Sequence, residues 1–372
     1  MQNRTPMSPL SSKTIQFMRF PLAMAIVFQH SYGHISSAKS AAVADSFTWH
    51  ALDWMRGFFS WTINGAALMA FGLIAGYLFF QHWDDTSSLE PIRWNWKRYG
   101  EKMYRRLYSL LLPYIVWNLL TAWYMHAPIT VHTFWDYRVW GQDAVNVFGL
   151  PLCPTRAPID TPFWFVRDLF VISLCTPIIY PIVRYGGIWS VVLAVMMYWL
   201  KMPHFMPSLT LLPLYIIGAY FSVHRKDLAA VSRKIWHPVM WIVVACSWGM
   251  LWLDGVAFDL VAPLIRLVLC IFYFYSASVI AERKPWNTPA WVAEASIVIY
   301  AGHFGLGVLN QCAQWATMLI PDSASGGMLA LRYFLAPMLC IGLCLIAYRL
   351  IYPSFIAKVL SGKCPPIKIQ SK

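Results

Sequence analysis

Charged residues are scarce in this sequence. They make up 12% of its 372 residues, with 16 Asp and Glu against 29 Lys and Arg, whereas hydrophobic residues make up 59%. Soluble globular domains carry about 25% charged and roughly 45–50% apolar residues, and disordered chains are poor in aromatic residues. Because Phe, Trp and Tyr reach 16% here, the composition excludes both classes and favours a protein that crosses a membrane several times.

Cysteine pairs with metal-binding spacing are absent. The eight cysteines are scattered, no two of them form C-x-x-C, and most lie in apolar runs, as do Cys175, Cys246, Cys270, Cys340 and Cys344. Cysteine in such runs behaves as a small hydrophobic residue. We therefore expect neither disulfides nor a bound metal.

The net charge of +13 would suggest a nucleic-acid partner in a soluble domain. Here the basic residues fall in short gaps between apolar runs, which is the pattern that membrane topology produces. We expect membrane lipid around the chain and no nucleic acid.

Long apolar windows are what the sequence does contain. A helix needs about 20 mostly apolar residues to cross a bilayer, and the sequence holds ten candidate windows, of which the fifth and sixth are short. The predicted fold is an all-α polytopic membrane protein, one domain over 1–372, with about ten transmembrane helices. The spans lie near 14–34, 58–81, 107–126, 162–183, 187–200, 208–223, 237–253, 259–281, 291–312 and 328–352.

The basic residues predict how these spans are oriented. With the N and C termini in the cytoplasm, 19 Lys and Arg fall in inner segments and 5 in outer segments. Cytoplasmic loops accumulate such residues, so we expect both termini to be cytoplasmic.

Two ionisable residues lie in the first predicted span. Arg19 and His30 are eleven residues apart, which puts them on one helix face about 16 Å apart along the axis. Charged groups within a bilayer are costly and indicate function. The alternative is that Arg19 snorkels to the interface and His30 only packs; His34, one turn further on, is a weaker candidate.

A basic segment precedes the third predicted span. Residues 94–118 read W-N-W-K-R-Y-G-E-K-M-Y-R-R-L-Y-S-L-L-L-P-Y-I-V-W-N. Its cations suit a polyphosphate ligand, although any cytoplasmic segment beside a membrane tends to be basic. The candidates are Lys97, Arg98, Lys102, Arg105 and Arg106.

Two further spans carry polar candidates. Arg167 and Asp168 lie near the start of the fourth, about 100° apart on a helix, so we expect them to pair with other helices and not with each other. In the ninth, Ser296, His303 and Asn310 recur at steps of seven. This spacing predicts a polar stripe on one helix face, either for hydrogen bonds between helices or for function.

Several of these segments together resemble one family, the integral-membrane acyltransferase family 3, which includes O-acetylases of O-antigen and other surface polysaccharides. The first-helix segment F-M-R-F-P-L-A-M-A-I-V-F-Q-H-S supplies the family's basic residue and histidine as Arg19 and His30. F-G-L-I-A-G-Y-L-F, L-L-L-P-Y-I-V-W-N, F-W-F-V-R-D-L-F and S-I-V-I-Y-A-G-H follow in family order. Two departures are Ala75, where the family has serine, and K-x-x-R at Lys102 and Arg105 where the family has R-x-x-R.

The resemblance implies transfer of an acyl group, most simply acetyl, from cytoplasmic acyl-CoA to a hydroxyl of a cell-surface glycan or its lipid-linked precursor, in the bacterial cytoplasmic membrane. His30 is the expected general base, because a histidine titrates near neutral pH. Arg19, Lys102, Arg105 and Arg106 are the expected CoA-phosphate ligands. Arg19, Arg167, Asp168 and His303 complete the predicted catalytic set, and no metal is implied.

Several alternatives stay open on the sequence. An acyl-histidine intermediate and direct transfer both fit, and Asn64, Arg167 and Asn310 are equal guesses for the oxyanion donor. The protein could instead be a transporter or flippase of a lipid-linked sugar, or a scaffold or sensor without activity. The acceptor, the acyl chain length and the oligomeric state are not specified.

Overall fold

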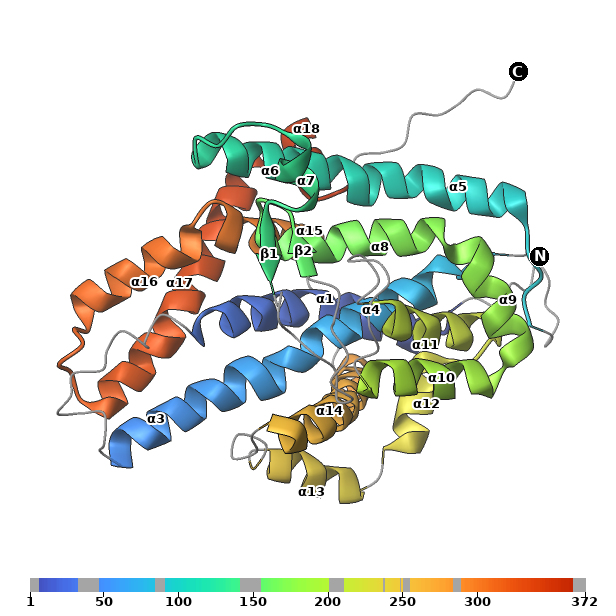
Figure 1. Ribbon diagram of the computed structural model, residues 1–372, viewed down its shortest axis with the longest axis horizontal. Helices are drawn as coiled ribbons and strands as arrows, with labels where there is room; N and C mark the ends of the chain where they lie inside the picture. Colours follow the sequence, from blue (N-terminus) through green and yellow to red (C-terminus); the bar gives the residue numbers. More distant parts are fainter. Residues whose placement is uncertain are drawn as a thin grey trace. The chain divides into compact units, whose positions relative to one another are not determined.

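A computed structural model describes residues 7–32, 47–83, 91–140, 155–200, 211–236, 238–247, 249, 255–283 and 289–363. The described chain is almost entirely helical (Figure 1). Its one small sheet pairs β1 (Arg138–Trp140) with β2 (Thr155–Ala157) in antiparallel fashion, with Val139 opposite Arg156. His34 and Cys246 lie outside the residues whose side chains are described.

Contacts divide the chain into two compact units. The first unit comprises Met1–Ser12, Gly72–Leu228 and Arg349–Lys372, and the second comprises Lys13–Phe71 and Ala229–Tyr348. Helices α1 (Pro9–His30), α4 (Ala67–Phe79), α12 (Leu228–Ile235) and α17 (Gly326–Ile351) contain the boundaries between them.

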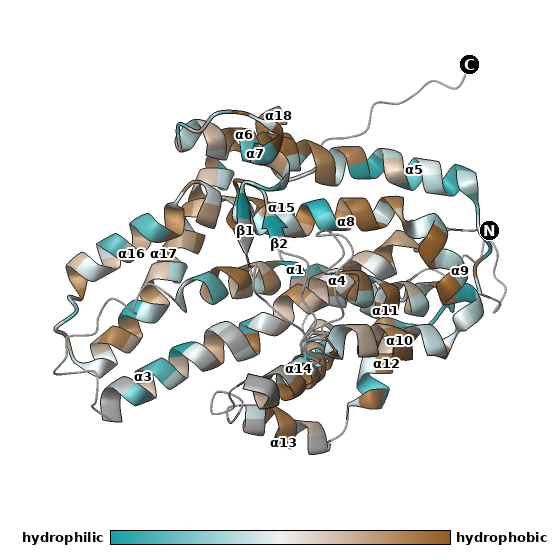
Figure 2. Cartoon of the chain, viewed as in Figure 1, coloured by the Kyte–Doolittle hydropathy of each residue, from teal (hydrophilic) through white to brown (hydrophobic). Residues whose placement is uncertain are grey.

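The first unit is built from helices between α4 and α11, closed by a short C-terminal helix. Its further elements are α5 (Trp96–Arg106), η4 (Leu107–Leu111), α6 (Leu112–Tyr124), α7 (Val131–Trp135), η5 (Thr161–Phe163), α8 (Trp164–Leu174), α9 (Thr176–Gly186), α10 (Ile188–Trp199), α11 (Leu212–Val223) and α18 (Phe355–Leu360). In Figure 2, α5 carries many hydrophilic residues, whereas α10 is mainly hydrophobic. This contrast agrees with a basic helix beside apolar spans.

Helices α4 and α11 approach each other more closely than side chains would allow. A Cβ atom at Gly76 would overlap the Tyr215 carbonyl oxygen, and one at Gly218 would overlap the Leu73 carbonyl oxygen. Further along, Gln81 Nε2 donates to Ser222 Oγ at 2.9 Å. The two helices therefore run side by side in the same direction, and glycine is required where their backbones touch.

In the second unit, the rest of α1 packs with helices from both of the segments that form this unit. Its elements are α3 (Phe47–Gly57), η2 (Phe58–Ile63), η3 (Asn64–Ala66), α13 (Pro238–Cys246), α14 (Gly255–Arg283), α15 (Ala290–Gly305) and α16 (Val308–Leu319), with α17. Ser60 Oγ lies 2.8 Å from Tyr333 Oη and donates to the Phe28 carbonyl at 3.1 Å. These bonds tie the end of α1 to η2 and α17.

Apolar helices long enough to span a bilayer number three in the described part of the chain. They cover His50–Phe79, Leu260–Arg283 and Gly326–Ile351, and two bent pairs, Thr161–Leu174 with Thr176–Gly186 and Ala290–Gly305 with Val308–Leu319, raise the number to five. The all-α class, with three to five candidate membrane spans, is therefore confirmed. The ten spans and the cytoplasmic termini stay predictions.

The two bent pairs correct the predicted continuous helices over 162–183 and 291–312. The first pair bends by 70° at Cys175, and the second by 69° where Gly307 adopts a φ of +64°. Glycine adopts a left-handed conformation at no steric cost, so the chain turns there. As a result, Asn310 lies on α16 and is exposed, whereas Ser296 and His303 are buried on α15. The expected stripe of three residues on one helix is wrong.

Candidate functional site

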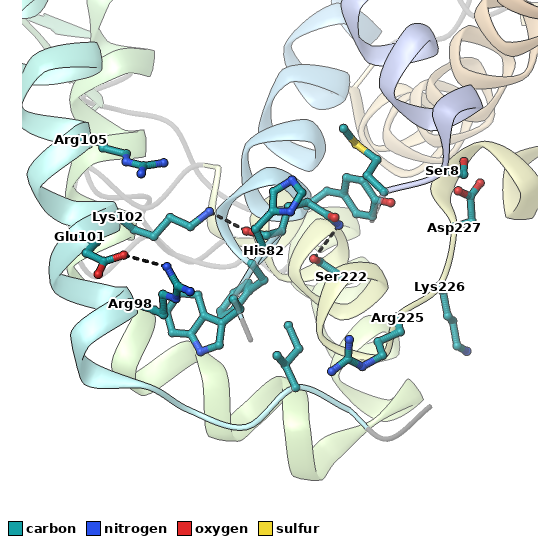
Figure 3. Close-up of a pocket in the computed structure, with 16 residues that line it drawn as sticks. Ser8, His82, Arg98, Glu101, Lys102, Arg105, Ser222, Arg225, Lys226 and Asp227 are labelled. Carbon is teal, nitrogen blue, oxygen red and sulfur yellow. Dashed lines mark hydrogen bonds and ion pairs between the residues drawn. The ribbon is translucent and has the colours of Figure 1, made fainter. Parts of the chain in front are cut away.

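A charged pocket lies within the first unit and is here called the anion pocket. It has a volume of about 560 Å³ and is lined by five Lys and Arg side chains but only two acidic ones. Figure 3 shows its basic residues on two sides, with those of α5 on one side and those that follow α11 on the other. The charged lining residues are Arg98, Lys102, Arg105, Arg225, Lys226, Glu101 and Asp227.

Helical spacing explains which α5 cations reach the anion pocket. Arg98, Lys102 and Arg105 are four and three residues apart and so share one helix face, and all three line the pocket. Arg106 points elsewhere. Its guanidinium carbon lies 5.6 Å from the centroid of the Phe79 ring, and it does not contribute to the lining. Of the five basic candidates on this segment, the structure therefore brings Arg98, Lys102 and Arg105 together at the pocket, whereas Lys97 and Arg106 are not among its lining residues.

Lys102 is held at the edge of the anion pocket. Its Nζ donates to the Gln81 carbonyl oxygen at 2.6 Å, while Arg98 Nη1 pairs with Glu101 Oε2 at 3.1 Å. Burial, followed by the nearby cations Arg106, Arg105 and Arg98, lowers the pKa of Lys102 to about 8. Crowded cations repel one another, so a bound polyanion would stabilise the charged form of Lys102.

The far side of the anion pocket was not predicted. Arg225 and Lys226 follow α11, and His82 follows α4. On the sequence Arg225 and Lys226 were counted only toward the positive-inside pattern, and His82 was not singled out. The only signal was that Arg225 and Lys226 form a basic pair directly after an apolar window.

Two histidines meet in the second unit. The rings of His30, the last residue of α1, and His303 on α15 lie 5.2 Å apart between centroids. Phe304 packs edge-on against His30, with 5.6 Å between ring centroids. The sequence marked both histidines separately, and the structure brings them together.

The hydrogen bonding of His303 fixes its proton. His303 is fully buried, and its Nδ1 lies 3.1 Å from the Ile299 carbonyl oxygen. A carbonyl oxygen can only accept, so Nδ1 carries the hydrogen. Among the described residues, Nε2 of His303 has no hydrogen-bond partner, which leaves its lone pair available in the neutral ring.

Arg19 lies on α1 in the second unit and is half-buried. It is not among the residues that line the anion pocket. The continuous helix from Pro9 to His30 agrees with the predicted shared face of Arg19 and His30.

Arg167 and Asp168 pair with each other, contrary to expectation. Arg167 Nε and Nη2 lie 3.2 and 3.0 Å from Asp168 Oδ1, and Nη1 donates to the Trp135 carbonyl at 2.7 Å. Both side chains are buried. The long arginine side chain folds back to its neighbour because a buried guanidinium needs a counter-ion. This arrangement ties α8 to α7. The catalytic role expected for the two residues stays a prediction.

No group of three or more His, Cys, Asp or Glu side chains among the described residues is arranged to hold a metal ion. Cys270, Cys312, Cys340 and Cys344 are free and buried, as expected for cysteines that act as small hydrophobic residues.

Comparison with protein families adds an independent finding. The model of a family described as an acyltransferase domain matches residues 13–349, which is most of the chain. No curated protein and no solved structure matches the sequence.

Proposed function

The chain belongs to acyltransferase family 3, and from this membership we propose that it moves an acyl group, most simply acetyl, from acyl-CoA to a glycan hydroxyl. The acceptor is a cell-surface glycan or its lipid-linked precursor. Family and apolar helices together make the protein a membrane acyltransferase. The cytoplasmic membrane of a bacterium is the proposed location, because the basic residues follow the positive-inside pattern.

The anion pocket is the observation that carries the choice of donor. Acyl-CoA bears several phosphate charges, and phosphate is bound by Arg and Lys through charge-assisted hydrogen bonds. Lys102 and Arg105 reach the pocket from one face of α5. On the predicted topology this segment is cytoplasmic, where acyl-CoA is found. Arg19 is a further candidate contact to the donor.

The histidine pair supplies the proposed chemistry. His30 takes the proton of the acceptor hydroxyl while the hydroxyl oxygen attacks the thioester carbonyl carbon. The carbon–sulfur bond then breaks, and the CoA thiolate takes up the proton from His30. A base that titrates near neutral pH suits this step.

His303 is proposed to orient His30. Its Nδ1 hydrogen is committed to Ile299, so its Nε2 lone pair can accept the N–H of His30. That bond would leave the other ring nitrogen of His30 to act as the base. The ring centroids lie 5.2 Å apart, and Nε2 of His303 has no hydrogen-bond partner among the described residues, so the rings must turn toward each other for this bond to form.

We favour direct transfer over an acyl-histidine intermediate, which would require His30 to act as the nucleophile. The two paths differ in one observable. Only the second leaves acyl label on the protein after incubation with donor alone.

The proposal is tested with detergent-purified protein and radiolabelled acetyl-CoA. We expect saturable binding, weakened at least tenfold in a Lys102→Ala, Arg105→Ala double variant because two charge-assisted contacts are lost. Arg184→Ala is the control, since Arg184 is basic but does not line the anion pocket.

Absence of acetyl-CoA binding by folded wild-type protein would contradict the proposal. It would favour the transporter or flippase of a lipid-linked sugar, because a carrier has no need of an acyl donor.

A further inference from the structure

Arg225 adopts a backbone conformation that is unusual for its residue type. Its φ is +52°, in the left-handed region that glycine occupies readily and other residues occupy at a cost. The Arg225 amide donates to the Ser222 carbonyl at 3.0 Å, and the Lys226 amide donates to the Phe221 carbonyl at 2.7 Å. These two bonds form a Schellman motif that ends α11, with arginine where glycine is most common.

A positive φ at a residue other than glycine occurs twice in the anion pocket. Three non-glycine residues in the described part of the chain have a positive φ, namely His82, His126 and Arg225, and both His82 and Arg225 line the pocket. Costly backbone conformations cluster at functional sites. At His126 the strain has no link to the pocket, whereas at His82 and Arg225 it coincides with a side chain that lines it.

The N-terminus of α1 reaches the same side of the anion pocket. Ser8 lines the pocket, and its Oγ accepts a hydrogen bond from the Ser11 amide at 3.0 Å, as a helix cap does. The dipole of this 22-residue helix adds positive potential at this end. Ser11 Oγ donates to Asp227 Oδ1 at 3.0 Å, which secures this first turn to the segment that follows Arg225.

Figure 3 shows how these groups face α5. Arg98, Lys102 and Arg105 lie on one side, Ser8 and Arg225 on the other, and His82 between them. Lys226 Nζ donates to Tyr220 Oη at 2.6 Å, so Lys226 contributes charge while Arg225 extends toward the α5 side. The anion pocket thus has two cationic walls.

We propose that Arg225, with His82 and the N-terminus of α1, forms a second phosphate-binding wall, so that the acyl donor is clamped between this wall and α5. The inference rests on the proposed function, because it takes acyl-CoA as the ligand. CoA carries a diphosphate and a separate phosphate on its ribose. Two phosphate centres on one molecule match two cationic walls across one pocket.

Arg225→Gly is the decisive variant because glycine preserves the left-handed backbone while removing the side chain. His126→Gly is its matched control. His126 has a φ of +51°, and its motif has the same two bonds, from the His126 amide to the Trp123 carbonyl and from the Ala127 amide to the Ala122 carbonyl. His126 does not line the anion pocket.

Both variants should melt at or above the wild-type temperature in detergent, since glycine fits either motif better. Only Arg225→Gly should bind acetyl-CoA more weakly, by tenfold or more. The ratio of affinities for acetyl-CoA and for phosphate-free acetyl-pantetheine should fall in Arg225→Gly and stay at the wild-type value in His126→Gly.

Equal acetyl-CoA affinity of Arg225→Gly and His126→Gly would overturn the second wall and leave the proposed function intact. Absence of binding by wild-type protein would overturn both. A lipid headgroup is the other source of phosphate, so vesicles containing phosphatidylglycerol form a separate arm. If Arg225→Gly loses affinity for these vesicles and none for acetyl-CoA, the second wall binds lipid and the proposal is refuted.

Discussion

In the first unit, five Lys and Arg side chains line the anion pocket, whose volume is about 560 Å³. In the second unit, by contrast, two histidine rings lie next to each other and beside aromatic side chains. Charges in the pocket come from several segments and partly duplicate one another. At the histidine pair, neither ring is duplicated by a second side chain in the proposed reaction. We infer that loss of one pocket cation weakens binding by degrees, while loss of one histidine removes the reaction.

The largest expected effect is at the histidine pair. His30→Ala should lower the rate of acetyl transfer by about 10²–10⁴-fold, the usual contribution of a general base, without changing acetyl-CoA affinity. His303→Ala should lower the rate less, because it removes only the group that orients the base. Transfer and binding are measured on the same purified protein.

His132→Ala serves as the control, because the His132 side chain is 73% exposed. Should His30→Ala retain the wild-type rate while folded, the contrast between the two regions would be lost and His30 would have no place in the mechanism.

The next largest effect is a loss of stability, without loss of binding, at the buried Arg167–Asp168 pair. Asp168→Asn removes the negative charge beside the buried Arg167 guanidinium, and breaking such a pair from one side costs about 3–5 kcal/mol. We expect a large fall in melting temperature in detergent. Any protein that stays folded should still bind acetyl-CoA.

Glu101→Gln provides the comparison, because the Arg98–Glu101 pair is partly exposed and such pairs contribute about 0–1 kcal/mol. If the two variants lost stability equally, the distinction between a buried structural pair and a surface pair would fail.

The smallest effect concerns pH. Below about pH 8 Lys102 is charged both with and without ligand, so its ionisation does not affect affinity. Above about pH 8 the free protein loses the Lys102 proton, whereas a bound polyanion favours the charged form. Binding must then take up a proton, so affinity for a non-hydrolysable acetyl-CoA thioether should fall as pH rises.

Lys102→Arg should remove this decline, because arginine stays charged throughout the range. The affinity is measured by isothermal titration calorimetry from pH 6.5 to 9.5, in steps of about half a pH unit. A Lys102→Arg profile that declines as the wild type does would assign the pH dependence to another group.

Local spacing accounts for what the sequence could predict. The shared face of Arg98, Lys102 and Arg105, the continuous first helix and both histidines follow from helical periodicity and from the cost of ionisable groups in a membrane. The bend at Gly307 was missed although Gly305 and Gly307 mark it, because the apolar character of the run continues across both glycines. The pairing of Arg167 with Asp168 was missed because backbone angles say little about a long side chain.

The second wall could not be predicted for another reason. Arg225 and His82 adopt a conformation that their residue types seldom adopt, so no turn signal marks them. The positive charge of Arg225 was already explained by topology, and His82 was not singled out. Only the structure shows that two helix ends, far apart in the sequence, deliver these side chains to one pocket.

The glycine contact between α4 and α11 has a consequence for ligand size. Six residues after Gly76 the chain reaches His82, and seven after Gly218 it reaches Arg225. The two backbones touch at these glycines, and Gln81 bonds Ser222 further on. The spacing of His82 and Arg225 is therefore set by contacts between the helices, outside the ligand-binding residues. A methyl group added at Gly76 or Gly218 would push the two backbones apart and so change the spacing of His82 and Arg225 across the pocket.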